Sequence, residues 1–329
     1  MTRNATNQLL QKAKKAKSDE FYTQLCDIER ELQYYSNRFV GKVVYCNCDD
    51  PRFSNFFRFF AIHFHELGLK KLIVSCYRED VNDLFLNHEA ENGFWCEYCG
   101  EDGDHFNPAN IRINYFKGNG DFRSAECIAL LKQADVVVTN PPFSLFREFV
   151  AQIIKYGKQF LVIGNVNAIT YKEIFELIQT GQAWLGVNLG RGISGFIVPD
   201  YYDQYGTETS INKEGQKIIA TNGCLWLTNI DTHIRHEEII LTKEYFGNEK
   251  YFPKYDNCNG INVNRTQDIP KDYNGIMGVP ITFLHKYNPE QFEIVRFRKG
   301  DDGKDLSING KCPYFRILIR RKQKTTEFC

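Results

Sequence analysis

Short runs of apolar, β-branched residues alternate along the first two thirds of the chain with longer segments whose apolar positions recur at helical spacing. Four runs read as buried parallel strands, because they carry no polar face: residues 41–47, 72–74, 136–138 and 160–164. The amphipathic segments, which predict helices, lie at 25–35, 56–67, 125–132 and 146–154. The alternation predicts an α/β fold in which helices connect neighbouring parallel strands.

The third of these runs ends in the turn Asn140-Pro141-Pro142-Phe143. Neither proline has an amide hydrogen for a strand ladder, so the strand cannot continue through them. We expect a stiff turn that presents the Asn140 side chain, the proline carbonyls and the Phe143 ring, with Ser144 as the N-cap of the next helix. Open α/β sheets bind ligands at the carboxyl ends of their strands, where this turn lies.

The turn has the groups needed for methyl transfer to an exocyclic amine. The amide oxygen of Asn140 and the carbonyl oxygen of Pro141 could each accept one amine hydrogen, which orients the nitrogen lone pair for attack. The ring of Phe143 offers a flat face for an unstacked base. In the alternative interpretation, Asn140 only bonds its own backbone in an ordinary strand-to-turn connection. The catalytic candidates are Asn140, Pro141, Pro142 and Phe143.

An Asn-Pro-Pro-Phe turn after a hydrophobic strand resembles the catalytic motif of the adenine methyltransferases that use S-adenosylmethionine. Over nearly its full length the chain is similar to one branch of them, the EcoRI-type adenine-specific DNA methyltransferases. Besides the turn, the resemblance rests on these motifs: Glu20-Phe21-Tyr22-Thr23-Gln24, Cys46-Asn47-Cys48-Asp49-Asp50-Pro51, Ser54-Asn55-Phe56, Gly120-Asp121-Phe122-Arg123, Asn167-Ala168-Ile169-Thr170-Tyr171 and Gly278-Val279-Pro280-Ile281-Thr282-Phe283.

The resemblance implies a doubly wound, mostly parallel Rossmann-like sheet with an antiparallel edge hairpin and a small C-terminal recognition module. We expect a basic N-terminal arm over residues 1–19, a methyltransferase core over 20–230 and a target-recognition region over 231–329. The implied activity is site-specific N6-methylation of a flipped adenine in double-stranded DNA, within a restriction-modification system or as a phage or orphan modification. A cognate restriction endonuclease that acts independently is a candidate partner, and the chain is expected to be a monomer.

The cofactor implied by the resemblance is S-adenosylmethionine, and its methionine part is expected against Phe21, Tyr22 and Thr23. Thr23 is also a suitable N-cap for the helix from Leu25, so its hydroxyl would lie at a helix N-terminus, where carboxylates bind. Gln24 departs from the proline that is common here in related enzymes.

Further cofactor ligands are expected in the loops after the first three strands. Most related enzymes have a glycine-rich turn after the first strand, whereas this chain has Asn47, Asp49 and Asp50 in a loop without glycine. Asp49 is favoured as a ligand, and Asp50 could be a ligand or a helix cap. The remaining candidates from these loops are Tyr77, with Glu79 as its alternative, Asp121 and Phe122. Asn140, in the catalytic turn, is also expected to contact the cofactor.

Residues 87–110 are predicted to be a polar surface insertion, followed by a strand over 111–115. Cys96 and Cys99 in this insertion, with His88 and His105, could supply four zinc ligands. We favour reduced surface thiols and predict no metal, because a second Cys-x-x-Cys is missing. The odd count of 11 cysteines also fits a reducing cytoplasm.

Charge and hydropathy exclude some classes of protein. Lys plus Arg and Asp plus Glu are equal at 41 each, so any phosphate-binding face must come from local clusters. No apolar run is long enough to cross a bilayer, and we expect a cytoplasmic protein without membrane contacts. The basic clusters, each of which could also be a solvated surface, are Lys12, Lys14, Lys15 and Lys17; Arg296, Arg298 and Lys299; and Arg316, Arg320, Arg321, Lys322 and Lys324.

Two other functions are compatible with the sequence. An Asn-Pro-Pro turn followed by an aromatic residue also resembles the motif of enzymes that methylate adenines of RNA or glutamines of proteins. The glycine-free loop after the first strand would also suit a non-catalytic DNA-binding protein on a methyltransferase fold. Methyl-transfer assays with DNA, RNA and protein acceptors would distinguish the first alternative from a DNA methyltransferase. A measurement of S-adenosylmethionine binding would distinguish the second.

Overall fold

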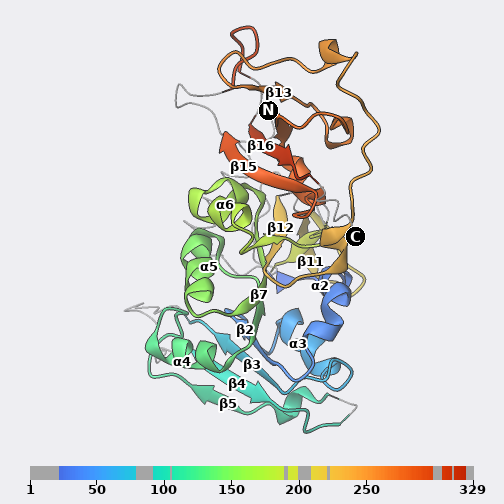
Figure 1. The fold of residues 1–329 in the computed structure, drawn as a ribbon. Coiled ribbons are helices and arrows are strands. Elements are labelled where there is room, and N and C mark those ends of the chain that lie inside the picture. The colour runs from blue at the N-terminus through green and yellow to red at the C-terminus, as the bar shows by residue number, and fades with distance from the viewer. Residues whose placement is uncertain are drawn as a thin grey trace, which may run out of the picture. The chain divides into compact units, whose positions relative to one another are not determined.

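The computed structural model describes residues 22–78, 92–103, 106–188, 192–198, 209–220, 223–298, 306–312 and 315–323. It is a mixed α/β structure with several sheets, in two compact units (Figure 1). Unit 1 contains residues 1–168 and 188–230, and unit 2 contains residues 169–187 and 231–329. Several predicted features lie outside the described residues: the 1–19 arm with its lysines, Phe21, Glu79, His88, His105, Lys299 and Lys324.

The larger sheet of unit 1 has four parallel strands at its centre, in the order β3–β2–β6–β7. Antiparallel strands extend it at both edges, with β4 and then β5 beyond β3, and β12 beyond β7. The strands are β2 (Val43–Asn47), β3 (Lys71–Cys76), β4 (Phe94–Tyr98), β5 (Ile113–Tyr115), β6 (Val136–Thr139), β7 (Gln159–Asn165) and β12 (Cys224–Thr228). The four apolar runs are therefore confirmed as the central strands, and nearly all of their residues are buried.

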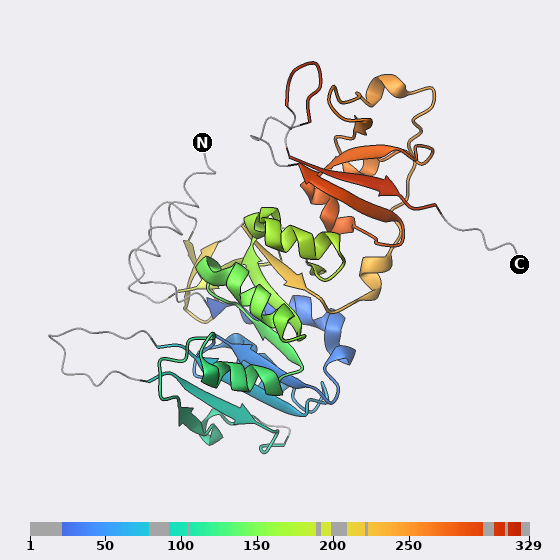
Figure 2. The ribbon, with the colours of Figure 1, turned by 60° about the vertical axis from the view of Figure 1, so that its left-hand side comes forward.

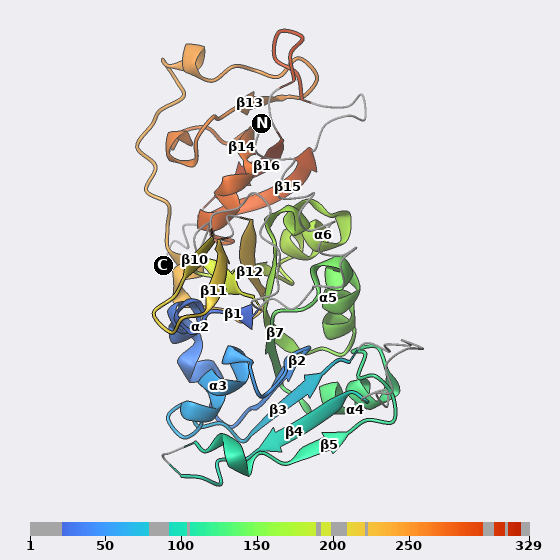
Figure 3. The same cartoon turned by 180° about the vertical axis from the view of Figure 1, so that it is seen from behind.

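Helices cover both faces of this sheet (Figures 1 and 3). Helices α2 (Leu25–Leu32) and α3 (Asn55–Ile62) lie on one face, and α4 (Ala125–Gln133) and α5 (Phe146–Lys155) lie on the other. Their apolar stripes pack onto the strands, as the edge-to-face pair of Phe56 with Trp226 shows. The predicted helices are confirmed, although α3 ends at Ile62 instead of Leu67. Helix α2 also ends early, at Leu32, and a 3-10 turn, η1 (Gln33–Arg38), follows it.

The prediction that Ser144 caps α5 is wrong. A short 3-10 turn, η3 (Phe143–Leu145), precedes the helix, and the cap position is Leu145, without a side-chain bond. The amide of Leu145 donates to the carbonyl of Pro142 at 3.0 Å, so the turn begins one residue before Phe143. The Pro142 carbonyl oxygen therefore already accepts one hydrogen bond within the turn.

The polar insertion contains a core strand that the sequence analysis missed. In β4, Phe94, Cys96 and Tyr98 are buried, while Trp95 and Glu97 are half-buried. This is the period-2 pattern of a strand with one apolar face. The expectation of a surface loop is wrong for these residues, because their alternation was obscured by the surrounding Asn, Asp, Glu and Gly.

A second sheet in unit 1 is small and entirely antiparallel, in the order β1–β9–β11–β10. Its strands are β1 (Tyr22–Thr23), β9 (Gly195–Ile197), β11 (Lys217–Ala220) and β10 (Thr209–Ile211). In its register Thr23 pairs with Phe196. The sheet thereby joins the N-terminal motif to a segment more than 170 residues later.

Unit 2 is built on a four-stranded sheet, visible in orange and red in Figure 2. Its order is β13–β14–β16–β15, with helix α6 against β15. Phe175 of α6 stacks on Phe297 with ring centroids 4.9 Å apart. The elements of this unit include α6 (Lys172–Gln179), β8 (Trp184–Leu185), β13 (Gly260–Asn262), β14 (Ile276–Pro280), β15 (Phe292–Arg298), β16 (Arg316–Arg321) and the 3-10 turns η5 (His233–His236), η6 (Glu249–Tyr251), η7 (Thr266–Asp268) and η8 (Ile281–Lys286).

A buried polar cluster lies at the centre of unit 2. The Asn262 side-chain oxygen accepts hydrogen bonds from Tyr255 Oη and Arg316 Nε, both at 2.9 Å. A Cβ on Gly278 would lie 2.0 Å from the Tyr255 oxygen, so only glycine leaves room for this ring. Arg316 is 7% exposed, and it is therefore a core residue instead of the solvated or phosphate-binding group expected from its basic cluster.

Among the described residues, no helix has both the length and the apolar character needed to cross a bilayer.

Candidate active site

The carboxyl ends of β2, β3 and β6 meet in a single hydrogen-bonded cluster. Ser75 at the end of β3 contacts the hydroxyl of Tyr45 at 2.7 Å and donates to the Asn47 side-chain oxygen at 3.3 Å. Thr139, the last residue of β6, donates to the main-chain carbonyl of Asn47. Side chains that the sequence places far apart are thus brought to one edge of the sheet, as expected for parallel strands.

The Asn140-Pro141-Pro142-Phe143 turn continues directly from this cluster. Pro141 is buried, whereas Asn140, Pro142 and Phe143 are half-buried. The side-chain oxygen of Asn140 is itself buried. The turn therefore places an amide oxygen, a tertiary-amide carbonyl and an aromatic ring together at the end of β6.

The small sheet brings the N-terminal motif to this turn. The Phe143 ring lies beside that of Phe196, with centroids 6.1 Å apart. Phe196 pairs in turn with Thr23. The carbonyl of Thr23 accepts a hydrogen bond from Asn55 Nδ2 of helix α3 at 2.8 Å. The N-terminal motif and the Asn140 turn, far apart in the sequence, are thus connected through β9.

Thr23 does not cap helix α2, contrary to the prediction. The cap position is Gln24, which has extended backbone and no side-chain capping bond. The Thr23 side chain is 3% exposed, and its hydroxyl has no hydrogen-bond partner among the described residues. A buried hydroxyl without a partner is costly, so this atom is suited to meet a polar group that binds here. Tyr22, the residue before Thr23 in the motif, has its ring centroid 6.2 Å from that of Phe53.

In the glycine-free loop after β2, a cysteine occupies the turn position that requires a left-handed backbone. Cys48 adopts a left-handed backbone, with φ of 65°, which glycine normally supplies. Asp49 follows it and is 8% exposed, with its two carboxyl oxygens turned toward Ser54 and Thr139. Asp50 is bound by Arg52, whose Nε and Nη2 atoms lie 2.9 Å and 2.6 Å from its carboxyl oxygens.

A similar acid–arginine pair occupies the loop before α4. Asp121 accepts hydrogen bonds from Arg123 Nε at 2.9 Å and from Arg123 Nη2 at 2.6 Å, and these bonds lower the pKa of Asp121. The Phe122 ring is buried edge-to-face against Phe149 of α5. Gly120, with φ of 79°, fits against the Cys76 carbonyl, where a Cβ would lie 2.6 Å away. The loop is therefore held at the end of β3.

Among the described residues that are predicted to contact the cofactor, Tyr77 is the most accessible. It follows β3 directly and is 46% exposed. The neighbouring Arg78 donates its amide to the Asn119 carbonyl at 2.8 Å, which ties this segment to the Asp121 loop. The structure thus brings Tyr77 and Asp121 to the same end of the sheet as Asn47.

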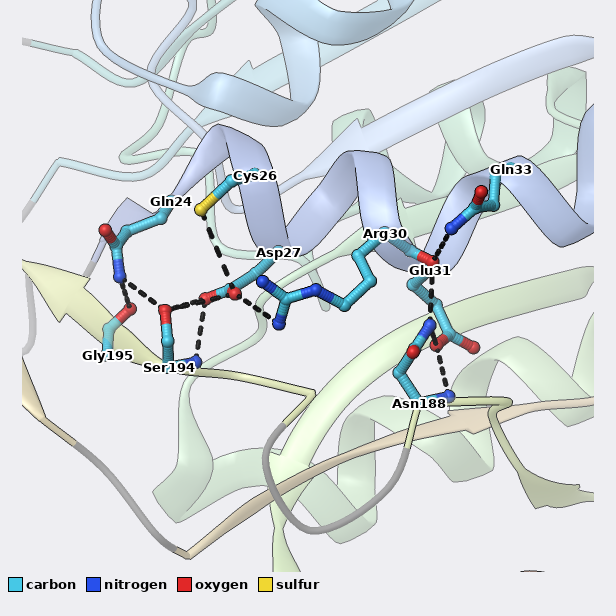
Figure 4. Close-up of polar contacts among 9 residues, drawn as sticks. All are labelled: Gln24, Cys26, Asp27, Arg30, Glu31, Gln33, Asn188, Ser194 and Gly195. Atoms are coloured by element: carbon cyan, nitrogen blue, oxygen red, sulfur yellow. Dashed lines mark hydrogen bonds and ion pairs between the residues drawn. The ribbon is translucent and has the colours of Figure 1, made fainter.

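Two buried acids of helix α2 attach it to the segment before β9 (Figure 4). Asp27 accepts from the Ser194 amide at 2.8 Å and from its hydroxyl at 2.9 Å. One turn later, Glu31 accepts from the Asn188 amide at 2.8 Å. Burial raises the pKa of Asp27, and the Ser194 bonds oppose this effect. The sequence offered one sign of this contact, because Asp27 and Glu31 share the face of Ile28 and Leu32.

The described residues contain no group of three or more His, Cys, Asp and Glu side chains placed to hold a metal ion. Cys96 is buried within β4 and Cys99 is exposed beyond its end. Burial raises the pKa of Cys96 to about 12, so in this structure the thiol is protonated at neutral pH. The histidines considered with them lie outside the described residues.

Comparison with known proteins gave one family and three curated relatives. The family model for the EcoRI adenine-specific methyltransferase matches residues 9–322. The chain is similar to the Type II methyltransferase M.EcoRI of Escherichia coli, with 64% identity over 98% of this chain and 99% of that protein. It is also similar to the Type II methyltransferases M.MgeORF184P of Mycoplasma genitalium and M.MpnI of Mycoplasma pneumoniae, at 38% and 37% identity, each over 95% of this chain and 98% of the relative. No solved structure matches the chain.

Proposed function

Because the chain belongs to the EcoRI family of adenine-specific methyltransferases, we propose that it transfers a methyl group from S-adenosylmethionine to the N6 amine of a flipped adenine in double-stranded DNA. Family membership confirms the resemblance inferred from the sequence motifs, and it makes the chain a restriction-modification type adenine methyltransferase. The cofactor, the duplex substrate and the residue roles are the parts that we propose.

The observation that supports these roles best is the convergence on the Asn140 turn. The turn lies at the carboxyl end of β6, beside the ends of β2 and β3, and its Phe143 ring contacts the β1–β9 pair. A methyl donor held by the strand ends and a base held by the turn would thus meet at one point. A turn used only for chain reversal does not need the N-terminal motif beside it.

The residues present fit the proposed cofactor. The buried Thr23 hydroxyl is a donor suited to the carboxylate of the methionine part, with Tyr22 beside it. Asn47, Tyr77 and Asp121 lie around the strand ends, where the ribose and adenine parts would be bound. Asp50 and Asp121 each carry an arginine partner, so a ligand would share or replace those ion pairs. When bound, the cofactor supplies an electrophilic methyl group on a sulfonium.

The chemistry assigned to this chain is orientation of the amine and stabilisation of developing charge. Asn140 Oδ1 and the Pro141 carbonyl oxygen accept one amine hydrogen each, which turns the lone pair toward the methyl donor. Phe143 supports the flipped base through its ring face. No strong base is needed, because methylation itself makes the amine hydrogen acidic, and the two acceptors then pass that proton to water.

We also propose the finer architecture and partners expected from the sequence. The β3–β2–β6–β7 core with helices on both faces supports a doubly wound, Rossmann-like sheet. Residues 231–329, which make up most of unit 2, are the proposed target-recognition module. The enzyme is expected to act as a monomer. Its expected partner is a restriction endonuclease that cleaves the same DNA site and acts independently.

Labelled methyl transfer tests the activity. Methyl groups from S-adenosylmethionine should appear in duplex DNA as N6-methyladenine, and not in RNA or in protein glutamine. Sequencing of methylated DNA from an expressing host gives the recognition site. Transfer to RNA or protein at a higher rate than to DNA would replace the proposed substrate, and absence of cofactor binding by calorimetry would rule out an enzyme of this kind.

Replacement of Asn140 by alanine tests the role of the turn. Asn140→Ala removes one of the two amine acceptors, so kcat should fall by on the order of 10² or more, while the Kd for the cofactor stays nearly unchanged. Asn114→Ala, on the exposed edge strand β5, is the matched control and should behave as wild type. Weaker cofactor binding with retained turnover of the bound enzyme would contradict this role.

A further inference from the structure

Asp49 joins three segments of the sheet edge through its side chain and backbone. Ser54 Oγ, at the start of α3, donates to one carboxyl oxygen at 2.9 Å. Thr139 Oγ1, at the end of β6, lies 2.8 Å from the other. The Asp49 amide donates to the Ser75 carbonyl of β3 at 2.9 Å. With both oxygens engaged and the side chain buried, Asp49 is better placed to support its neighbours than to bind a ligand.

The hydrogens available at Thr139 favour a protonated Asp49. The Thr139 hydroxyl carries one hydrogen but contacts two oxygens, the Asp49 carboxyl and the Asn47 carbonyl. The Asn47 carbonyl can only accept, so it takes the Thr139 hydrogen. The second contact then needs a hydrogen from Asp49. When Asp49 is protonated, it donates to Thr139 and Thr139 donates to the Asn47 carbonyl, so every contact has its hydrogen. When Asp49 is ionised, its carboxylate and the Asn47 carbonyl compete for the single Thr139 hydrogen.

The surroundings of Asp49 also favour its neutral form. The titratable groups facing it are the carboxylate of Asp50 and the thiols of Cys46, Cys48 and Cys76. Burial raises the pKa of Asp49 to about 7, and Asp50 adds to this effect, although the bonds to Thr139 and Ser54 oppose it. The arginines that could offset the charge, Arg52 and Arg78, form their ion pairs with Asp50.

We propose that Asp49 is a positioning residue for the Asn140 turn, which in its protonated form holds Thr139 against the Asn47 carbonyl and thereby fixes the residue that follows. The inference rests on the proposed function, since it assigns Asp49 to the turn that binds the amine instead of to the cofactor. Ionisation of Asp49 loosens the end of β6 and lowers turnover without loss of cofactor affinity.

The test compares Asp49→Asn with Asp49→Ala in kcat–pH profiles and in cofactor calorimetry. The side-chain amide introduced by D49N can accept from Ser54 and donate to Thr139 at every pH, so the ratio of D49N to wild-type kcat should rise as the pH passes through about 7. Asp49→Ala should lower kcat on the order of tenfold or more, because the turn is misplaced. Both variants should bind S-adenosylmethionine with a Kd within about threefold of wild type.

Thr139 supplies a second pair of variants in case those at Asp49 fold poorly. Thr139→Ser keeps the hydroxyl and should match wild type, whereas Thr139→Val should reproduce the loss seen in D49A. A D49N variant that binds cofactor weakly, with an unchanged kcat–pH profile, would make Asp49 a ligand and overturn the proposal. So would a Thr139→Val enzyme with wild-type turnover.

Thermal unfolding gives a readout that does not depend on activity. Because the folded state holds the Asp49 proton more tightly than the unfolded chain does, its stabilising effect is full below the ordinary pKa of 3.8 and is lost as the pH rises to about 7. The unfolding temperature of wild type should therefore fall relative to D49N over this range. A constant difference would overturn the protonated state, even if the enzyme methylated a substrate other than DNA.

Discussion

At the scale of single residues, several positions of the candidate site have residue types that suggest a different local structure from the one observed. Cys48 lies in the left-handed region where a glycine is expected. Threonine and serine are common at helix N-caps, yet neither Thr23 nor Ser144 caps a helix. These predictions failed because Thr23 is paired in a strand and Ser144 lies inside a 3-10 turn, and both contexts are set by tertiary contacts. The Asp49–Thr139 contact, between positions 90 apart in the sequence, left no local signal.

The backbone of Cys48 predicts how this position tolerates substitution. Cys48→Gly should be as stable as wild type or more stable, because a left-handed L-residue costs about 1 kcal/mol that glycine avoids. Cys48→Val should lower the free energy of unfolding by on the order of 2 kcal/mol, because a β-branched residue is worst in this region.

Denaturant unfolding of these two variants measures the difference. Cys26→Val, at an exposed position of helix α2, is the control for the same side-chain change in ordinary backbone. Equal losses in Cys48→Val and Cys26→Val would mean that the left-handed backbone at Cys48 is not a constraint.

At the scale of elements, the central strands followed from their apolar composition, whereas β4 and the pairing of the small sheet did not. β2, β3, β6 and β7 are buried on both faces, so their sequences are continuous apolar runs that are easy to recognise. β4 has one apolar face and lies in a polar insertion, and its period-2 pattern was missed. The small β1–β9 sheet depends on pairing across the chain, which no local pattern encodes.

The attachment of α2 to the β9 segment predicts an effect of Asp27 on both stability and binding. Asp27→Ala removes the acceptor of two Ser194 hydrogen bonds and should cost about 2 kcal/mol, as measured by denaturant unfolding. It should also weaken cofactor binding, because Ser194 precedes the strand that pairs with Thr23.

Glu29→Ala, at an exposed position of the same helix, is the matched control and should change neither quantity. A D27A protein with lower stability but wild-type cofactor affinity would show that α2 supports the fold without supporting the candidate site.

At the scale of the whole molecule, the two units are interleaved along the chain. Residues 169–187 belong to unit 2, although unit 1 continues at residue 188. Within unit 2 this segment contacts later parts of the chain: Gln179 donates to the Val295 carbonyl at 2.7 Å, and Arg235 lies 3.7 Å from the Trp184 ring centroid. The predicted boundary at residue 230 treats 169–187 as core, which remains to be tested.

Truncation tests that boundary. A chain that ends at Ile230 should bind an apolar dye and self-associate, because Phe175 and Trp184 lose their partners Phe297 and Arg235. A chain that ends at Gln323 keeps every described residue and should stay monodisperse in size-exclusion chromatography. A monodisperse fragment ending at Ile230, without dye binding, would support the core predicted over residues 20–230.

The interleaving also sets an order of events during synthesis on the ribosome. Helix α6 is complete once residue 179 has been made, but its stacking partner Phe297 follows more than a hundred residues later. At an elongation rate of about 5–20 residues per second, this delay is on the order of ten seconds. During that interval the apolar face of α6 lacks its later stacking partner, so the nascent chain should be a better chaperone client than the finished enzyme.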